Sequence, residues 1–74
     1  MLRALVGRTI LPFDAASAEE YGRLRAYLDR QATPIGDADT RIAAIALAND
    51  LTLATGNLRP FLRVPDLHVE NWLA

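Results

Sequence analysis

Residues 39–55, with the sequence DTRIAAIALANDLTLAT, decide the fold of this chain. Residues 42–48 are apolar without interruption, and Asn49 and Asp50 close the run, so we expect a helix here. Residues 51–55 alternate apolar and hydroxyl side chains and are rich in strand formers, which predicts a strand. A helix that is apolar on every side is normally covered by several neighbours. The stretch therefore indicates further elements or an oligomer around this helix.

The segment before this stretch predicts another strand and another helix. Residues 9–13 (TILPF) are typical of a short strand with a proline near its end. Asp14 stands at a helix N-cap position, and the helix should end near Gln31, because Pro34 disfavours helical geometry in the residue before it. Residues at three- and four-residue steps predict the buried face of this helix: Ala18, Tyr21, Leu24 and Leu28.

The segment after the stretch completes the order of elements. Gly56 and Asn57 break the strand, residues 58–67 are expected to form a loop, and residues 68–72 a last short strand. Helical crossovers between the first strands favour at least one parallel pair. The predicted fold is α/β, with a short, mostly parallel sheet and two main helices.

Composition narrows the class of protein. The chain has 74 residues and no cysteine, so it is one domain or part of one and no disulfide or thiolate metal site stabilises it. Its hydrophobic content of 51% argues against disorder. A net charge of −1 argues against binding nucleic acid through a basic surface alone. No apolar run reaches membrane-spanning length and no signal peptide is recognisable, so we expect a cytoplasmic protein.

Three stretches carry a resemblance to a known family. The first is LPFD at residues 11–14 with the pattern A-x-x-Y-x-x-L at 18–24. The second is I-G-x-x-D-x-x-I-A-A at 35–44. The third combines three patterns: L-T-L-A-T-x-N at 51–57, F-x-x-V-P-x-L at 61–67 and E-N-W at 70–72. In this order and spacing the chain resembles the C-terminal part of PIN-domain ribonucleases of the VapC toxin type, including the FitB-like branch.

The resemblance implies a metal-dependent endoribonuclease that acts as the toxin of a toxin–antitoxin system. RNA would be the substrate, a VapB-type antitoxin the partner, and a homo-oligomer the assembly. In this family several carboxylates at the C-terminal edge of a parallel sheet hold Mg²⁺ or Mn²⁺. Residues 1–74 would form a partial PIN-like domain without the family's N-terminal half. On this interpretation residues 2–7 (LRALVG) are the tail of the family's preceding helix.

Three residues are candidate metal ligands. Asp39 matches the family's acid at the start of the Ile-Ala-Ala helix and is the candidate catalytic residue; its alternative role is a charge favoured by the helix dipole. Asp37 is either an outer-shell acid or a helix N-cap. Asn57 follows a strand, where α/β sites are built, and offers a neutral carbonyl ligand or a turn. The family's first acid and the acid on its early helix belong to the half that this chain lacks.

Further residues have a functional and a structural interpretation. Arg59 and Arg63 follow the strand and either contact RNA phosphates or are solvated in a loop. Arg41 is expected to pair with Asp37 or another acid. His68 is interpreted as structural or exposed rather than catalytic, and Trp72 as packed in a core or an interface.

The sequence leaves open two alternatives to the interpretation of this chain as part of a ribonuclease. One is a non-catalytic truncated PIN module that binds an antitoxin or a toxin half. The other is the product of a decayed reading frame that folds only by self-association.

Overall fold

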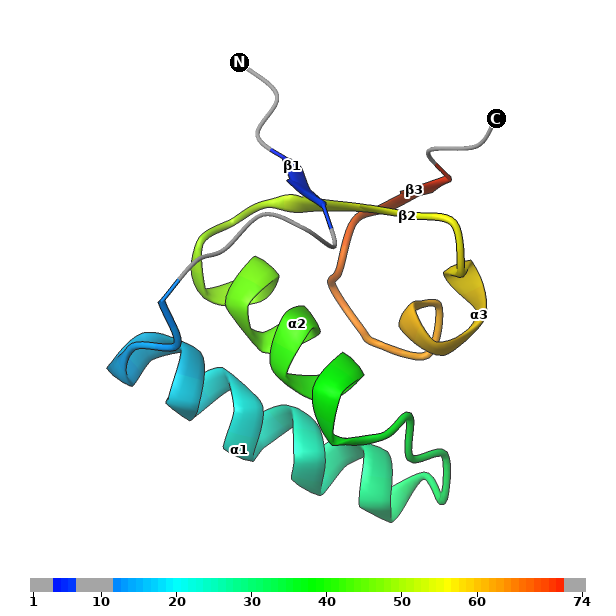
Figure 1. The fold of residues 1–74 in the computed structure, drawn as a ribbon. Coiled ribbons are helices and arrows are strands. Elements are labelled where there is room, and N and C mark those ends of the chain that lie inside the picture. The colour runs from blue at the N-terminus through cyan, green and yellow to red at the C-terminus, as the bar shows by residue number, and fades with distance from the viewer. Residues whose placement is uncertain (1–3, 7–11, 72–74) are drawn as a thin grey trace.

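The computed structural model describes residues 4–6 and 12–71 (Figure 1). The elements in chain order are β1 (Ala4–Val6), α1 (Ala15–Arg30), α2 (Asp37–Ala48), β2 (Thr52–Thr55), α3 (Leu58–Phe61) and β3 (Val69–Asn71). This confirms the predicted α/β class with two main helices. The short helix α3 lies in a segment that was expected to be a loop throughout, and it carries the buried side chain of Phe61.

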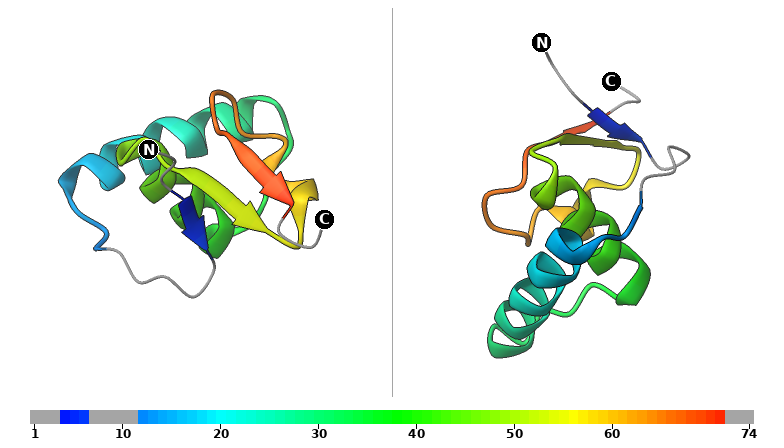
Figure 2. Two further views of the ribbon diagram at one scale, coloured as in Figure 1. Left: turned by 90° about the horizontal axis from the view of Figure 1, so that it is seen from above. Right: turned by 90° about the vertical axis from the view of Figure 1, so that its left-hand side faces the viewer.

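The three strands form one parallel sheet in the order β1-β2-β3. Leu53 of β2 is in register with Leu5 on one side and with Val69 on the other. A parallel pair needs a crossover connection, and α1 and α2 together provide it between β1 and β2. The helices lie on the same side of the sheet (Figures 1 and 2). The predicted parallel pairing is therefore confirmed for both strand pairs.

Helix α1 begins and ends where local sequence predicts. The Ser17 backbone N–H donates a 2.9 Å hydrogen bond to Asp14 Oδ1, which is the expected N-cap interaction. Gln31 is the C-cap residue. The buried face is partly wrong in the prediction, because Ser17 is buried while Ala18 is exposed. Two turns of an α-helix span about seven residues. The residue on the same face as Leu24, two turns earlier, is therefore Ser17 and not Ala18.

Helix α2 lies between α1 and the sheet. Its buried residues are small (Ala43, Ala44 and Ala46), and small side chains let neighbouring elements approach closely. The core around them comprises Leu24, Leu28, Leu51, Leu53, Phe61 and Val64. The remaining apolar side chains of α2 are only partly buried: Ile42, Ile45 and Leu47. The described residues thus cover α2 on the side of its alanines and leave its larger apolar side chains partly exposed, and the expectation of further elements or an oligomer stays a prediction.

The N-terminal region differs from the prediction. The strand expected over residues 9–13 falls largely outside the described residues, and Pro12 and Phe13 lie in no strand. The strand that pairs with β2 is Ala4–Val6, so the interpretation of residues 2–7 as the tail of a helix is wrong. Pairing with the edge of β2 satisfies the backbone N–H and C=O groups of Ala4–Val6, which a strand needs as much as a helix does.

Candidate functional site

The candidate acids lie in the first turn of α2, and a glycine sets where this turn begins. Gly36 occupies the N-cap position with φ 93° and ψ 155°, a conformation that is essentially restricted to glycine. Its carbonyl oxygen accepts hydrogen bonds from Thr40 Oγ1 at 2.6 Å and from the Thr40 backbone N–H at 3.0 Å. Asp37 is the first helical residue, so its prediction as the N-cap is wrong.

The carboxylate of Asp37 instead joins α2 to α1. The Tyr21 hydroxyl donates a 2.5 Å hydrogen bond to Asp37 Oδ1. Arg41 Nε lies 3.1 Å from Asp37 Oδ2, which confirms the expected Arg41 pair. Arg25 in turn donates to the Tyr21 hydroxyl at 3.1 Å, and this hydrogen bond raises the pKa of the Arg25 guanidinium. Both oxygens of Asp37 therefore already have a protein donor.

Asp39, two residues after Asp37, has a different environment. Its side chain is partly buried, and within the described residues it has no hydrogen-bond or ion-pair partner. In the first turn the helix dipole favours an anion, so the location is compatible with both interpretations of this residue. Of the two acids in this turn, Asp39 is the one whose carboxylate is available to an external cation.

Asn57 directly follows β2 and stands at the N-cap position of α3. Its backbone N–H donates a 3.1 Å hydrogen bond to Thr55 Oγ1, and its exposed side chain makes no capping hydrogen bond. Helix α2 crosses below β2 at an oblique angle (Figure 1). Asp39, in the first turn of α2, and Asn57, directly after β2, come from two separate elements.

The described residues do not by themselves match the ligand set of a hard divalent cation. Mg²⁺ and Mn²⁺ prefer several oxygen ligands, including carboxylates. Across residues 4–6 and 12–71, no group of three His, Cys, Asp or Glu side chains is placed to hold a metal ion. Asp39 offers one free carboxylate and Asn57 one amide carbonyl, which leaves most of a coordination shell to other donors.

The remaining candidates occupy exposed positions. Arg59 in α3 and Arg63 after it are both exposed. Neither arginine has an ion-pair partner in the described part of the chain. They follow the strand end, as predicted, and both RNA contact and solvation remain compatible with this position. His68 is exposed as expected, and Trp72 lies outside the described residues.

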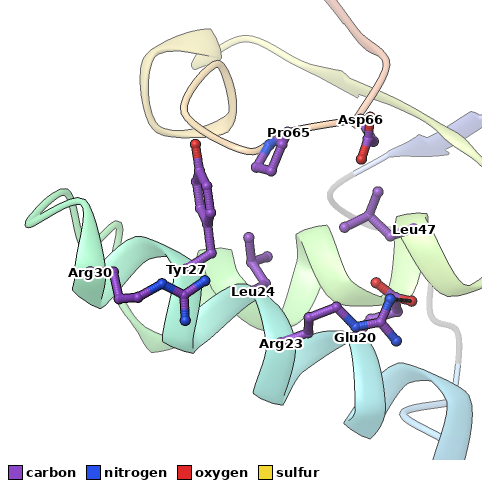
Figure 3. Close-up of a pocket in the computed structure, with 8 residues that line it drawn as sticks. All are labelled: Glu20, Arg23, Leu24, Tyr27, Arg30, Leu47, Pro65 and Asp66. Carbon is purple, nitrogen blue, oxygen red and sulfur yellow. Dashed lines mark ion pairs between the residues drawn. The ribbon is translucent and has the colours of Figure 1, made fainter.

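A separate cavity of about 460 Å³ lies between α1, α2 and the segment after α3 (Figure 3). Leu24, Leu47 and Pro65 point toward one another in it, and the Arg23–Glu20 ion pair, 3.3 Å long, lies at its rim. Asp39 is not among its lining residues. Sequence patterns did not indicate this cavity, since the residues that line it come from three segments brought together by tertiary packing.

Known proteins match most of this chain over about half of their own length. No family model matches the chain. The chain is 40% identical over 63 residues to the tRNA(fMet)-specific endonuclease VapC of Salmonella typhimurium, covering 85% of this chain and 48% of that protein. It is 41% identical over 63 residues to Ribonuclease VapC2 of Rickettsia felis, covering 85% and 47%. This chain matches one part of a VapC ribonuclease. It spans about half the length of the VapC relatives it matches.

Solved VapC structures agree with the fold of the VapC-like chain. The crystal structure of VapBC2 from Rickettsia felis bound to a DNA fragment from its promoter matches with a TM-score of 0.81 and 41% identity. That match covers 86% of this chain and 48% of the other. The structure of VapBC-1 from nontypeable Haemophilus influenzae matches with a TM-score of 0.81 and 31% identity, covering 90% and 49%. The α/β arrangement is therefore that of about half of a VapC chain.

Proposed function

We propose that this chain is the C-terminal part of a PIN-type ribonuclease of the VapC class, the toxin of a toxin–antitoxin system. The observation that carries the proposal is the match of 85% of the chain, at about 40% identity, to proteins named as VapC ribonucleases. The carboxylate of Asp39, which has no hydrogen-bond or ion-pair partner among the described residues, supports a role as a metal ligand in this proposal.

In this proposal Asp39 is a ligand of Mg²⁺ or Mn²⁺, and Asn57 is a weaker candidate. Asp37 is a poorer ligand than the sequence suggests, because Tyr21 and Arg41 already engage both of its oxygens. The described residues leave the acid set incomplete, so no catalytic step is assigned to the metal in this chain alone. Arg59 and Arg63, exposed beyond β2, would contact phosphates of an RNA substrate.

The proposed partners follow from the same relatives. The matched solved structures are VapBC complexes, two of them bound to DNA, and a VapB-type antitoxin is the corresponding partner for this chain. A homo-oligomer in the cytoplasm belongs to the same proposal. No helix among the described residues is long and apolar enough to span a bilayer.

A second candidate function is a non-catalytic truncated PIN module that binds an antitoxin or a toxin half. The engagement of Asp37 by two protein donors favours it, because one available carboxylate in this turn is too few to fix the geometry of a cation. The two candidates differ in whether the chain cleaves RNA.

The test is RNA cleavage by the purified chain with Mn²⁺, beside an EDTA control. Asp39→Ala removes the proposed ligand, and Glu19→Ala removes an exposed carboxylate of α1 as the matched control. We expect cleavage that EDTA and Asp39→Ala abolish and that Glu19→Ala leaves unchanged. Cleavage that survives Asp39→Ala contradicts the assigned ligand. Absence of cleavage by the unaltered chain, with folding verified by circular dichroism, favours the binding module.

A further inference from the structure

The cavity of about 460 Å³ between α1, α2 and the segment after α3 has an apolar interior (Figure 3). Leu24, which is 4% exposed, is the most buried of its lining residues. Tyr27 and Leu47 are half-buried and stand on opposite sides of it (Figure 3). Small-molecule sites usually have volumes of about 300–1,000 Å³ and combine apolar walls with a few polar groups. The size and lining of this cavity therefore suit a small organic molecule.

Two unpaired charges of opposite sign lie at the rim of the cavity. Glu20 and Arg23 form an ion pair and offset one another. Arg30, at the end of α1, and Asp66, after α3, have no ion-pair partner among the described residues. They lie at opposite ends of the cavity, with Leu24 between them (Figure 3). A molecule that uses both charges must therefore carry an anionic group and hydrogen-bond donors, separated by an apolar or aromatic body.

The acid of this pair has an uncommon backbone conformation. Asp66 has a φ of 65°, in the left-handed region that few residues other than glycine adopt. Residues in such conformations cluster at ligand sites. In Figure 3 the carboxylate of Asp66 points from the segment after α3 toward Leu47. An ionised carboxylate only accepts hydrogen bonds, so a ligand at this end of the cavity must supply N–H or O–H donors.

A guanine nucleotide combines the groups that these residues require. Its phosphate is anionic, and an arginine guanidinium binds phosphate through two parallel N–H···O bonds. The Watson–Crick edge of guanine presents a ring N–H beside an amino group, and these two donors match the two oxygens of one carboxylate. The same edge of adenine places an acceptor beside its amino group, which a carboxylate repels. Bases also stack on aromatic side chains such as that of Tyr27.

We propose that this cavity binds a guanine nucleotide. The base lies between Tyr27 and Leu47, with its Watson–Crick edge toward Asp66 and its phosphate toward Arg30. A free α-amino acid fits less well, because its ammonium and carboxylate groups are attached to one carbon and cannot reach both ends of the cavity. The site does not depend on the proposed ribonuclease activity, since Asp39 is not among the lining residues. A free nucleotide and an unpaired guanosine of an RNA chain offer the same chemistry.

The test is titration calorimetry of the purified chain with guanosine monophosphate, adenosine monophosphate and guanosine. EDTA in the buffer removes any contribution of a metal ion to phosphate binding. We expect guanosine monophosphate to bind about tenfold or more tightly than adenosine monophosphate, because only guanine supplies two donors to Asp66. Arg30→Gln should weaken binding of guanosine monophosphate by about fivefold or more, because a charge-assisted contact is lost. The same variant should leave the affinity for guanosine unchanged.

Asp66→Asn tests the base contact, since asparagine tolerates the left-handed conformation but offers one carbonyl oxygen in place of two acceptors. Asp50→Asn is the matched control, because Asp50 is also exposed, has a φ of 53° and lies outside the cavity lining. We expect Asp66→Asn to abolish the preference for guanine and Asp50→Asn to keep it. Equal effects of the two variants, equal affinity for both monophosphates, or no binding by a chain that circular dichroism shows to be folded would overturn the inference.

A single-stranded RNA with one unpaired guanosine distinguishes the two sources of the nucleotide. Displacement of guanosine monophosphate by this RNA, and not by the same RNA with adenosine in that position, would assign the cavity to an RNA nucleotide. Binding of guanosine monophosphate that the RNA does not displace would assign it to the free nucleotide. Either result supports the site. Guanine binding by a chain that cleaves no RNA would count against the proposed function alone.

Discussion

The Tyr21 hydroxyl donates a 2.5 Å hydrogen bond to Asp37 Oδ1, and this single contact joins the middle of α1 to the first residue of α2. It engages an acid that its place in the sequence suggested as either an outer-shell metal ligand or a helix N-cap. Because Arg41 engages the other oxygen, the first turn of α2 has a structural acid at Asp37 and an available acid at Asp39. The two acids of this turn therefore differ in their contacts.

Removing the Tyr21 hydroxyl should destabilise the fold. Tyr21→Phe leaves the ring in place and takes away the donor to Asp37, so the free energy of unfolding should fall by about 1 kcal/mol. Tyr27→Phe is the matched control, since Tyr27 is also partly buried on α1 and its hydroxyl has no hydrogen-bond partner in the described residues. Urea unfolding of both variants measures the difference. Equal losses would mean that the Tyr21–Asp37 bond contributes nothing specific.

The two glycines near α2 and in α1 should respond to alanine with opposite signs. Gly36→Ala imposes a side chain at φ 93°, and such backbone strain costs about 1–3 kcal/mol. Gly22 lies within α1, where an added Cβ meets nothing within 4 Å, so Gly22→Ala should stabilise the protein by about 1 kcal/mol. Thermal unfolding measures both changes. A stabilising Gly36→Ala would contradict the assigned conformation of the α2 N-cap.

The contribution of the Asp14 cap should depend on pH. The hydrogen bond from the Ser17 backbone N–H lowers the pKa of Asp14 below its ordinary value of 3.8. A carboxylate with a lowered pKa in the folded state stabilises the fold above its ordinary pKa, and the contribution is lost as pH falls through the lowered value. Asp14→Ala should therefore destabilise the protein at neutral pH and have a smaller effect near pH 2. Urea unfolding at both pH values tests this, with Glu19→Ala as the uncapped control.

The buried side chain of Leu28 in α1 should contribute strongly to stability. Leu28 is 2% exposed, so Leu28→Ala leaves a cavity and should cost about 2–5 kcal/mol. Leu62 is 69% exposed, and Leu62→Ala should change stability by less than about 0.5 kcal/mol. Chemical denaturation distinguishes the two. A similar loss at Leu62 would indicate that this side chain is covered in solution, which an oligomer would explain.

Several features of the fold were accessible from local sequence because their causes are local. Asp14 caps α1 through a bond to a residue three positions later, and the helix ends before Pro34, as the steric effect of proline requires. The alternation of residues 51–55 predicted β2, because strand geometry alone puts neighbouring side chains on opposite faces. The acid at Asp39 was found by its spacing within a family pattern, although its role as a ligand stays a prediction.

Other features depended on contacts between distant segments. The pairing of Ala4–Val6 with β2 was missed because an edge strand of three residues has little signal of its own. The N-cap at Gly36 in place of Asp37 was missed because a glycine has no capping side chain to recognise, and the contact of Asp37 with Tyr21, sixteen residues earlier in the chain, was missed because it joins two elements. Neither result follows from a periodicity in the sequence.

The amino-acid sequence by itself determined the two main helices, the central strand and the family pattern, since these follow from short-range sterics, capping and side-chain spacing. Tertiary structure alone decided which acid of α2 is engaged, where the first strand pairs and that the helices lie on one face of the sheet (Figure 2). These outcomes depend on hydrogen bonds and packing between elements far apart in the chain. A local sequence pattern does not predict such contacts.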